Sequence, residues 1–366
     1  MAIAIGVGRF AYTPLLVVMH ADAGLSLPFA GILASANLAG YLVGALAGMR
    51  APRGTDRRRE IAAACGGVVL LTACMALPAW AWLPARFLTG VCSGIAFVAV
   101  VSLMFDYAGA SGRRGGIGVF FTGVGIGIAA AGALTPAFAA LGGSRGAWLA
   151  FALLAFIVLL VVLPGIPSGE ATHAVAAASG TSAGRGRLVF LNLVYAVEGA
   201  AYIIPATFIV AMVSEDAALA PYGSLTWIVV GLVAAPSAIF WTWFEQRAGR
   251  VPALVTALAA QGVALLAPLV VPSPADAVVV ALGLGGTFMG ITLLATALGR
   301  AVDPQRGVQI VAVMTVWYGL GQIAGPLVAT RIVVATGSYR DSLFLAGAAL
   351  LAATALYVAR VRAKPA

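Results

Sequence analysis

The chain has 366 residues, of which 62% are hydrophobic and 9% charged, and its formal net charge is +9. A soluble domain carries about 25% charged residues, so this composition excludes a water-soluble globular protein and indicates that lipid covers the outer surface. The basic residues lie in short clusters between apolar segments, as in membrane proteins, and they require no nucleic-acid partner.

Apolar segments long enough to cross a bilayer follow one another along the whole chain. A membrane-spanning helix needs about 20 mostly apolar residues, and proline or glycine marks most of the breaks between segments. The pattern predicts an all-α membrane protein with twelve transmembrane helices, at residues 1–19, 28–49, 60–78, 82–106, 115–141, 146–164, 188–213, 223–246, 251–271, 275–299, 307–335 and 341–360.

The basic residues indicate the direction of the predicted helices. If the N-terminus is cytoplasmic, most of the 21 Lys and Arg residues fall in cytoplasmic segments, and the outside loops contain only Arg145 and Arg340. Cytoplasmic loops of membrane proteins carry such an excess. We therefore expect a multi-pass protein of the plasma (inner) membrane with both termini in the cytoplasm.

A polar stretch divides the predicted helices into two sets of six. Residues 165–187 are rich in Gly, Ser and Ala, which predicts a flexible cytoplasmic linker. The expected organisation is an N-terminal six-helix bundle at 1–164 and a C-terminal six-helix bundle at 188–366. Weak sequence echoes between the halves favour parallel repeats that rock about a central site.

Two ionisable residues lie alone in the middle of apolar spans. Arg9 is roughly 16 Å from one end of the first span, and Glu198 is roughly 15 Å from the opposite face in the seventh. Both are therefore near the midplane of a hydrocarbon core about 30 Å thick. A charge at this depth costs about 2.5–3.5 kcal/mol or more and marks a binding site or a pathway by default.

Several local patterns resemble those of a known transporter superfamily. RFLTG at 86–90 is similar to the RxxxG motif on the fourth helix of the major facilitator superfamily, and EQRAGR at 245–250 looks like its acidic–basic gating loop. GRFAYTPLL at 8–16 and EGAAYIIPATF at 198–208 resemble the first and seventh helices of the YbfB/YjiJ-type branch. The resemblance covers nearly the whole chain and implies a fold in which the first, fourth, seventh and tenth spans line a central cavity.

In that fold, Arg9 and Glu198 would face each other across the two halves. We interpret Arg9 as a receptor for an anionic group, because a guanidinium matches carboxylate or phosphate and does not titrate. Glu198 would be a proton-coupling carboxylate. The alternative is a permanent bridge between the two that only joins the halves. Arg86 is either a further proton-coupling or gating residue or an interfacial anchor.

Polar side chains at helical spacing predict the walls of this cavity. The predicted substrate-binding residues are Arg9, Tyr12, Thr13, Asn192, Tyr195, Tyr202, Tyr318 and Gln322. Ordinary hydrogen bonding between membrane helices is the alternative interpretation. The predicted gating residues are Asp106, Arg113, Glu245, Arg247 and Arg250. For Asp106 the alternative is a solvated helix end.

No enzyme signature has the context that its chemistry requires. The only lysine, Lys364, lies in the C-terminal tail, so a Walker A loop for ATP cannot form. His20 and His173 match no metal-binding motif. We expect no cofactor, no metal site and no catalytic activity.

These observations predict a secondary active transporter that moves a small organic solute, anionic in the leading hypothesis, by proton-coupled alternating access. Its partners would be the solute, protons and the lipid bilayer, and we expect a monomer. The alternative is a multidrug efflux antiporter, because apolar cavity walls and a single acidic residue suit lipophilic cations. A non-transporting membrane receptor is more remote, because the longest loop has only about two dozen residues.

Overall fold

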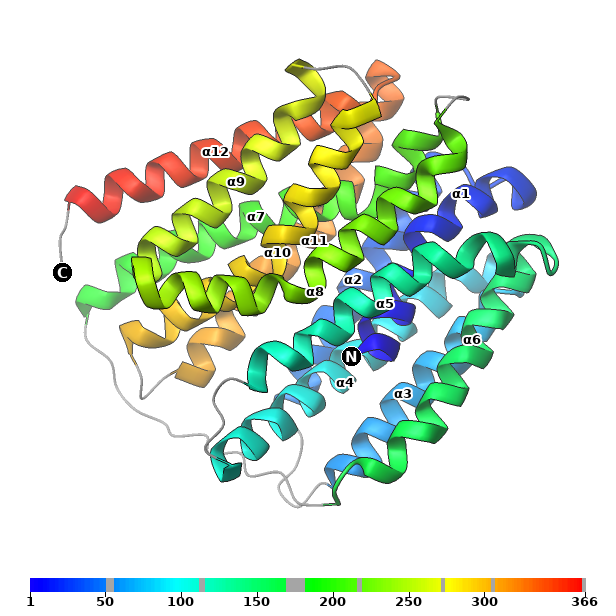
Figure 1. The fold of residues 1–366 in the computed structure, drawn as a ribbon, viewed down its shortest axis with the longest axis horizontal. Coiled ribbons are helices and arrows are strands. Elements are labelled where there is room, and N and C mark those ends of the chain that lie inside the picture. The colour runs from blue at the N-terminus through cyan, green and yellow to red at the C-terminus, as the bar shows by residue number, and fades with distance from the viewer. Residues whose placement is uncertain are drawn as a thin grey trace.

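The computed structural model describes residues 1–50, 56–111, 116–168, 182–215, 219–270, 274–303 and 307–363. Within these ranges the chain is almost entirely helical (Figure 1). A π-helical segment, Ala2–Phe10, runs into the first α-helix. The α-helices are α1 Tyr12–Ala23, α2 Leu27–Gly48, α3 Arg57–Cys74, α4 Trp82–Ser111, α5 Gly116–Ala139, α6 Gly143–Val162, α7 Ser182–Ser214, α8 Gly223–Ala248, α9 Arg250–Val270, α10 Pro274–Val302, α11 Gly307–Thr336 and α12 Tyr339–Ala363.

Local sequence signals explain where several helices begin and end. α1 ends at Gly24, whose φ of 65° lies in the left-handed region that glycine adopts without strain. Asp56 begins α3, because its Oδ1 accepts a hydrogen bond of 3.0 Å from the Arg58 amide. Asp22, which is far from α6 in the sequence, caps the start of that helix in the same way: its Oδ2 accepts a hydrogen bond of 2.5 Å from the Ser144 amide.

Eleven helical segments in the described ranges are long and apolar enough to cross a membrane. They correspond to eleven of the twelve predicted spans. The other predicted span, at 60–78, is occupied by α3, which begins with the charged run Arg57–Glu60 and is therefore less apolar. The chain is a multi-pass α-helical membrane protein, and the predicted fold class is confirmed.

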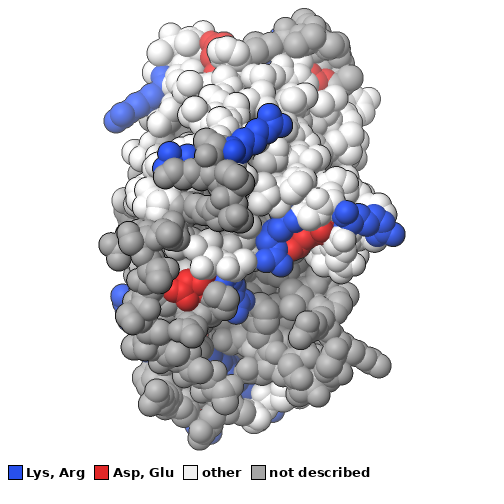
Figure 2. All heavy atoms as spheres, turned by 90° about the vertical axis from the view of Figure 1, so that its left-hand side faces the viewer, with Lys and Arg blue, Asp and Glu red and all other residues white. Residues whose placement is uncertain are grey.

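Helices α1–α6 gather on one side of the molecule and α7–α12 on the other (Figure 1). The predicted boundary at 165–187 lies mostly outside the described residues, so the division into two bundles remains a prediction. Charged side chains, most of them basic, are scattered over the face toward the C-terminus (Figure 2). The predicted cytoplasmic location of the termini likewise remains a prediction.

Small residues let the two groups of helices approach closely. A Cβ atom on Gly125 of α5 would lie 2.4 Å from the backbone nitrogen of Ala235 in α8. On the other side, a Cβ on Gly31 of α2 would lie 2.6 Å from Cγ2 of Thr330 in α11. The Ser35 hydroxyl also donates to the Ile323 carbonyl oxygen at 2.8 Å. These contacts hold the halves together from the α1–α2 turn toward the middle of the molecule.

Candidate functional site

Arg9 is 8% exposed and lies near the end of the π-helical segment. Its guanidinium donates to the Tyr202 hydroxyl on α7 and lies over the rings of Phe10 and Tyr41, at 5.0 and 5.5 Å from their centroids. These contacts are with aromatic rings and one neutral hydroxyl. The positive charge of Arg9 is therefore held by aromatic faces and not by a carboxylate.

Arg86 on α4 is 3% exposed and approaches the same segment from the other side. Its Nη1 donates to the Gly8 carbonyl oxygen at 3.2 Å, and its guanidinium carbon lies 4.5 Å from the ring centroid of Tyr12. The Asn37 amide on α2 also donates to Gly8, at 3.3 Å, and to the Arg86 carbonyl oxygen at 2.9 Å. The backbone carbonyl of Gly8 thus accepts hydrogen bonds from both the arginine and the amide. Gly8 belongs to the π-helical segment, and π-helical turns are frequent at functional sites.

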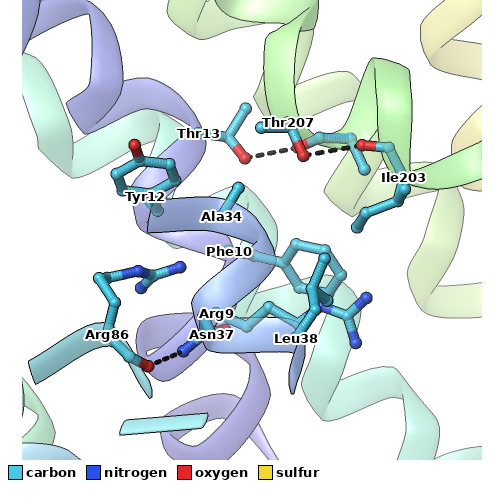
Figure 3. A pocket seen from close by; sticks show the side chains of 11 residues that line it. Arg9, Phe10, Tyr12, Thr13, Ala34, Asn37, Leu38, Arg86, Ile203 and Thr207 are labelled. Atoms are coloured by element: carbon cyan, nitrogen blue, oxygen red, sulfur yellow. Dashed lines mark hydrogen bonds between the residues drawn. The ribbon is translucent and has the colours of Figure 1, made fainter. Parts of the chain in front are cut away.

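A small cavity lies between these arginines and α7 (Figure 3). Its volume is about 20 Å³, room for a water molecule and not for an organic solute. The lining residues are Arg9, Phe10, Tyr12, Thr13, Ala34, Asn37, Leu38, Arg86, Ile203, Ala206 and Thr207. The structure therefore brings the predicted residues of the first span together with Arg86 and with α7.

The cavity carries positive charge without a protein counterion. None of the four ion pairs among the described residues includes Arg9 or Arg86. The Nε atoms of both arginines are buried and have no hydrogen-bond partner in the described part of the chain. An unpaired buried charge is costly, so the geometry favours an anionic ligand at this site.

Tyr202 connects the cavity to the second half of the molecule. Its hydroxyl interacts with Arg9 and also accepts a hydrogen bond of 3.0 Å from the Gln322 amide on α11. Its ring stacks on Phe288 and Tyr318, each at a centroid distance of 5.6 Å. Tyr195 continues the stack, at 4.2 Å from Tyr318. Four predicted substrate-binding residues therefore form one polar and aromatic layer.

Glu198 lies on α7 between Tyr195 and Tyr202 and is fully buried, in a cluster that belongs to the second half. Its Oε1 accepts a hydrogen bond of 3.4 Å from Gln261 on α9, and Gln261 Oε1 accepts one of 2.7 Å from Thr287 on α10. Tyr318 also interacts with the carboxyl group. The second oxygen, Glu198 Oε2, has no hydrogen-bond partner among the described residues. No ion pair among the described residues includes Glu198.

The structure contradicts the alternative of a permanent Arg9–Glu198 bridge. Tyr202, one helical turn beyond Glu198, takes the hydrogen bond of Arg9. The carboxyl group is instead held by Gln261 and Tyr318. The hydroxyl of Tyr202 takes one hydrogen bond of the guanidinium, and the carboxyl group bonds elsewhere, so the two ionisable groups are not paired with each other.

Asn192 and the described gating residues at the α8–α9 junction do not line the cavity. Asn192 is buried on α7 with its Oδ1 unpartnered. At the α8–α9 junction, Arg250 Nε lies 2.5 Å from Glu245 Oε1, and the Arg247 guanidinium lies 4.1 Å from the Trp243 ring centroid. Arg113 and the side chain of Asp106 lie outside the described residues.

Sequence reasoning missed Asn37, Tyr41, Gln261 and Thr287. Asn37 and Gln261 are single amides in otherwise apolar spans, and this signal was available because buried polar groups in membranes are rare and tend to be functional. Thr287 carried no such signal, because threonine is common in membrane helices, where its hydroxyl bonds a backbone carbonyl of the preceding turn. Only the packing of α7, α9 and α10 brings it to Glu198.

Comparison with known proteins identifies the family. The family model described as "Uncharacterised MFS-type transporter YbfB" matches residues 1–358, nearly the whole chain. The chain belongs to this family. It is therefore a major facilitator superfamily (MFS) transporter, and the predicted family and the absence of an enzymatic role are confirmed.

Among solved structures, the crystal structure of the nucleoside transporter NupG is similar to this MFS chain. The match has a TM-score of 0.74 at 15% sequence identity and covers 98% of each chain. At this identity the likeness shows the fold alone. No curated protein matches the chain in sequence.

Proposed function

We propose that this MFS transporter moves a small organic anion by proton-coupled alternating access. The observation that carries the proposal is the pair of buried, unpaired guanidinium groups around one central cavity. An anionic substituent of the solute would supply the counterion that the protein lacks, and Arg presents donors that match carboxylate or phosphate.

Alternating access follows from the small size of the cavity. Its volume of about 20 Å³ is too small for a solute, so the halves must separate before substrate enters. The close contacts of α5 with α8 and of α2 with α11 would form the closed side. The ion pair between Glu245 and Arg250, together with Arg247, Asp106 and Arg113, would act at the other side as gating groups.

Glu198 is the coupling group in this proposal. It is buried, it has no cationic partner among the described residues, and Tyr202 and Tyr318 join it to the arginine cavity. A carboxyl group in such a place is suited to bind and release a proton during the transport cycle. Arg86 was predicted to take part in coupling, whereas its place in the cavity wall favours a role in binding the anion.

Multidrug efflux is the second candidate, and the aromatic layer favours it. The rings of Tyr195, Tyr318, Tyr202 and Phe288 offer flat faces to a planar lipophilic compound. The two candidates differ in their need for Arg9. Efflux of a lipophilic cation can proceed without this arginine, whereas anion transport cannot.

The proposal extends to the setting of the transporter. We place it in the plasma (inner) membrane as a monomer with both termini in the cytoplasm, in agreement with the distribution of its basic residues. In that orientation, the contacts at the α1–α2 turn close the outer side, and the cavity opens toward the cytoplasm when the gating groups part.

The test uses purified protein in liposomes with an imposed pH gradient and a panel of radiolabelled metabolites, including carboxylates, phosphate esters, nucleosides and lipophilic cations. We expect gradient-driven flux of an anionic compound, its loss in Arg9→Ala, and gradient-independent exchange in Glu198→Gln. Flux of a cation that survives Arg9→Ala would favour efflux. Flux of an anion with unchanged proton coupling in Glu198→Gln would refute the coupling assignment.

A further inference from the structure

We propose that Gln261 and Thr287 form a hydrogen-bond switch that holds Glu198 equally well with and without a proton. The inference rests on the proposed function, since it concerns the coupling site of that transporter. It names the two residues that adapt the proton site to each protonation state.

The hydroxyl of Thr287 has two acceptors within reach and a single hydrogen. Its Oγ1 lies 2.7 Å from Gln261 Oε1 and 2.6 Å from the Gly283 carbonyl oxygen. A hydroxyl group donates once and accepts through its lone pairs. Thr287 can therefore donate to only one of these oxygens at a time.

The first arrangement fits an ionised Glu198. The Gln261 amide nitrogen faces the carboxylate and donates to Oε1 at 3.4 Å, while Thr287 donates to Gln261 Oε1. In this arrangement the bonded amide hydrogen points toward the carboxylate, and the hydroxyl hydrogen points toward the amide oxygen. The negative charge is thus met by a donor.

The second arrangement fits a protonated Glu198. Turning the Gln261 amide by 180° exchanges its oxygen and nitrogen without altering the shape of the side chain. The amide oxygen would then accept the carboxylic hydrogen, the amide nitrogen would donate to Thr287 Oγ1, and Thr287 would donate to Gly283. The carboxylic hydrogen, one amide hydrogen and the hydroxyl hydrogen are then each paired, so the site accommodates the added proton by one rotation.

The surroundings of Glu198 favour a proton over a metal cation. Among the described residues, the side chains of Tyr195, Tyr202 and Tyr318 and the Gln261 amide interact with the carboxyl, and the Arg9 guanidinium lies beyond Tyr202. A metal cation would need several oxygen ligands spread around it, whereas Gln261 is already in direct contact with the carboxylate. A proton fits between the two side chains without separating them.

The experiment is an infrared difference titration of the full-length protein in lipid nanodiscs, with pH as the only variable. A carbonyl band of a protonated carboxyl group should disappear as the pH rises, and it should be absent in Glu198→Gln. An amide band lost in Gln261→Leu should change over the same pH interval. Because Thr287 bonds Gln261 in both arrangements, Thr287→Val should displace this amide band at both ends of the titration and leave the midpoint nearly unchanged, and Thr287→Ser should displace neither.

The outcomes separate the switch from the proposed function. If Glu198 titrates but the Gln261 amide band does not change over the same pH interval, or if Thr287→Val leaves that band unaltered, the switch is wrong and the proton site stands. If no band belongs to Glu198, or if sodium ions produce the spectral change at fixed pH, the proton site fails as well. Gln261→Leu tests the same network from its other end, so a poorly folding Thr287→Val does not prevent a decision.

Discussion

Arg9 and Arg86 show how a membrane transporter tolerates charge where hydrocarbon surrounds the protein. Aromatic faces, one backbone carbonyl and one tyrosine hydroxyl hold the two guanidinium groups. These contacts reduce the cost of burial but leave the charge uncompensated. A site of this kind is less stable when empty than when an anion occupies it.

A test of this trade-off replaces Arg9 with methionine. Removing a charge from the membrane interior gains about 2.5–3.5 kcal/mol, and loss of the bond to Tyr202 costs about 1 kcal/mol. We expect Arg9→Met to stabilise the empty protein by about 1.5–2.5 kcal/mol while abolishing anion binding. Thermal unfolding in detergent measures the first effect, and ligand-induced stabilisation measures the second.

The matched control is Arg331→Met, because Arg331 is an exposed arginine on α11. Exposed substitutions generally change stability by less than about 0.5 kcal/mol. Destabilisation by Arg9→Met of more than 1 kcal/mol would show that the arginine is a structural member of the bundle, contrary to the binding role proposed for it.

Residue-level prediction from sequence succeeded where the signal was local. A lone charge in an apolar run identified Arg9 and Glu198, and the spacing of i, i+3 and i+4 placed Tyr12 and Thr13 beside Arg9. The partner of Glu198 is a different matter. Gln261 lies 63 positions away, and no local pattern specifies which helix packs against α7 at that level.

At the scale of elements, glycine decides how closely the two halves can meet. Gly125 in α5 and Gly231 in α8 face each other's backbones, and a Cβ at Gly231 would lie 2.2 Å from the Ala129 nitrogen. Backbone atoms cannot move aside as a flexible side chain can. This contact is therefore available only in sequences that keep glycine at both positions.

We predict that Gly125→Ala weakens the closed side by about 1–3 kcal/mol, the usual cost of overpacking. The new Cβ would meet Ala235 at 2.4 Å, so α5 and α8 must separate. Spin labels at Leu141 and Tyr222, which are exposed at this end, should show a longer distance by pulsed electron resonance.

Gly286→Ala serves as the comparison, because a Cβ there meets only Val233 Cγ1 at an ordinary 3.5 Å. Its label distances should match those of the parent protein. Equal distances in Gly125→Ala would mean that the α5–α8 contact does not determine the closed arrangement.

At the scale of the whole molecule, α2 of the first half packs along α11 of the second. Contacts run from Gly31 beside Thr330 to Ser35 beside Ile323 along α2 and α11. Transport by alternating access requires these contacts to break in every cycle. Preventing the separation should therefore stop transport without touching the cavity.

A disulfide between positions 31 and 330 makes this prediction testable. We expect Gly31→Cys with Thr330→Cys, in a background without Cys65, Cys74 and Cys92, to form a cross-link spontaneously because the two positions are in contact. Flux into liposomes should fall below a tenth of the uncross-linked value and return on reduction. Thr330→Cys alone is the control, and unimpaired flux through the cross-linked protein would exclude opening on this side.

The amino-acid sequence by itself determined the membrane class, the helices, the family and the two midplane charges, because each follows from composition, from apolar runs about 20 residues long or from motifs within one helix. Only the tertiary structure decided that Arg9 donates to Tyr202, whereas Glu198 accepts a hydrogen bond from Gln261, which itself accepts one from Thr287. The physical reason is that these partners come from four different helices, and their meeting depends on which helical faces pack together. The periodicity of one helix indicates which residues share a face, but it does not indicate which other helix packs against that face.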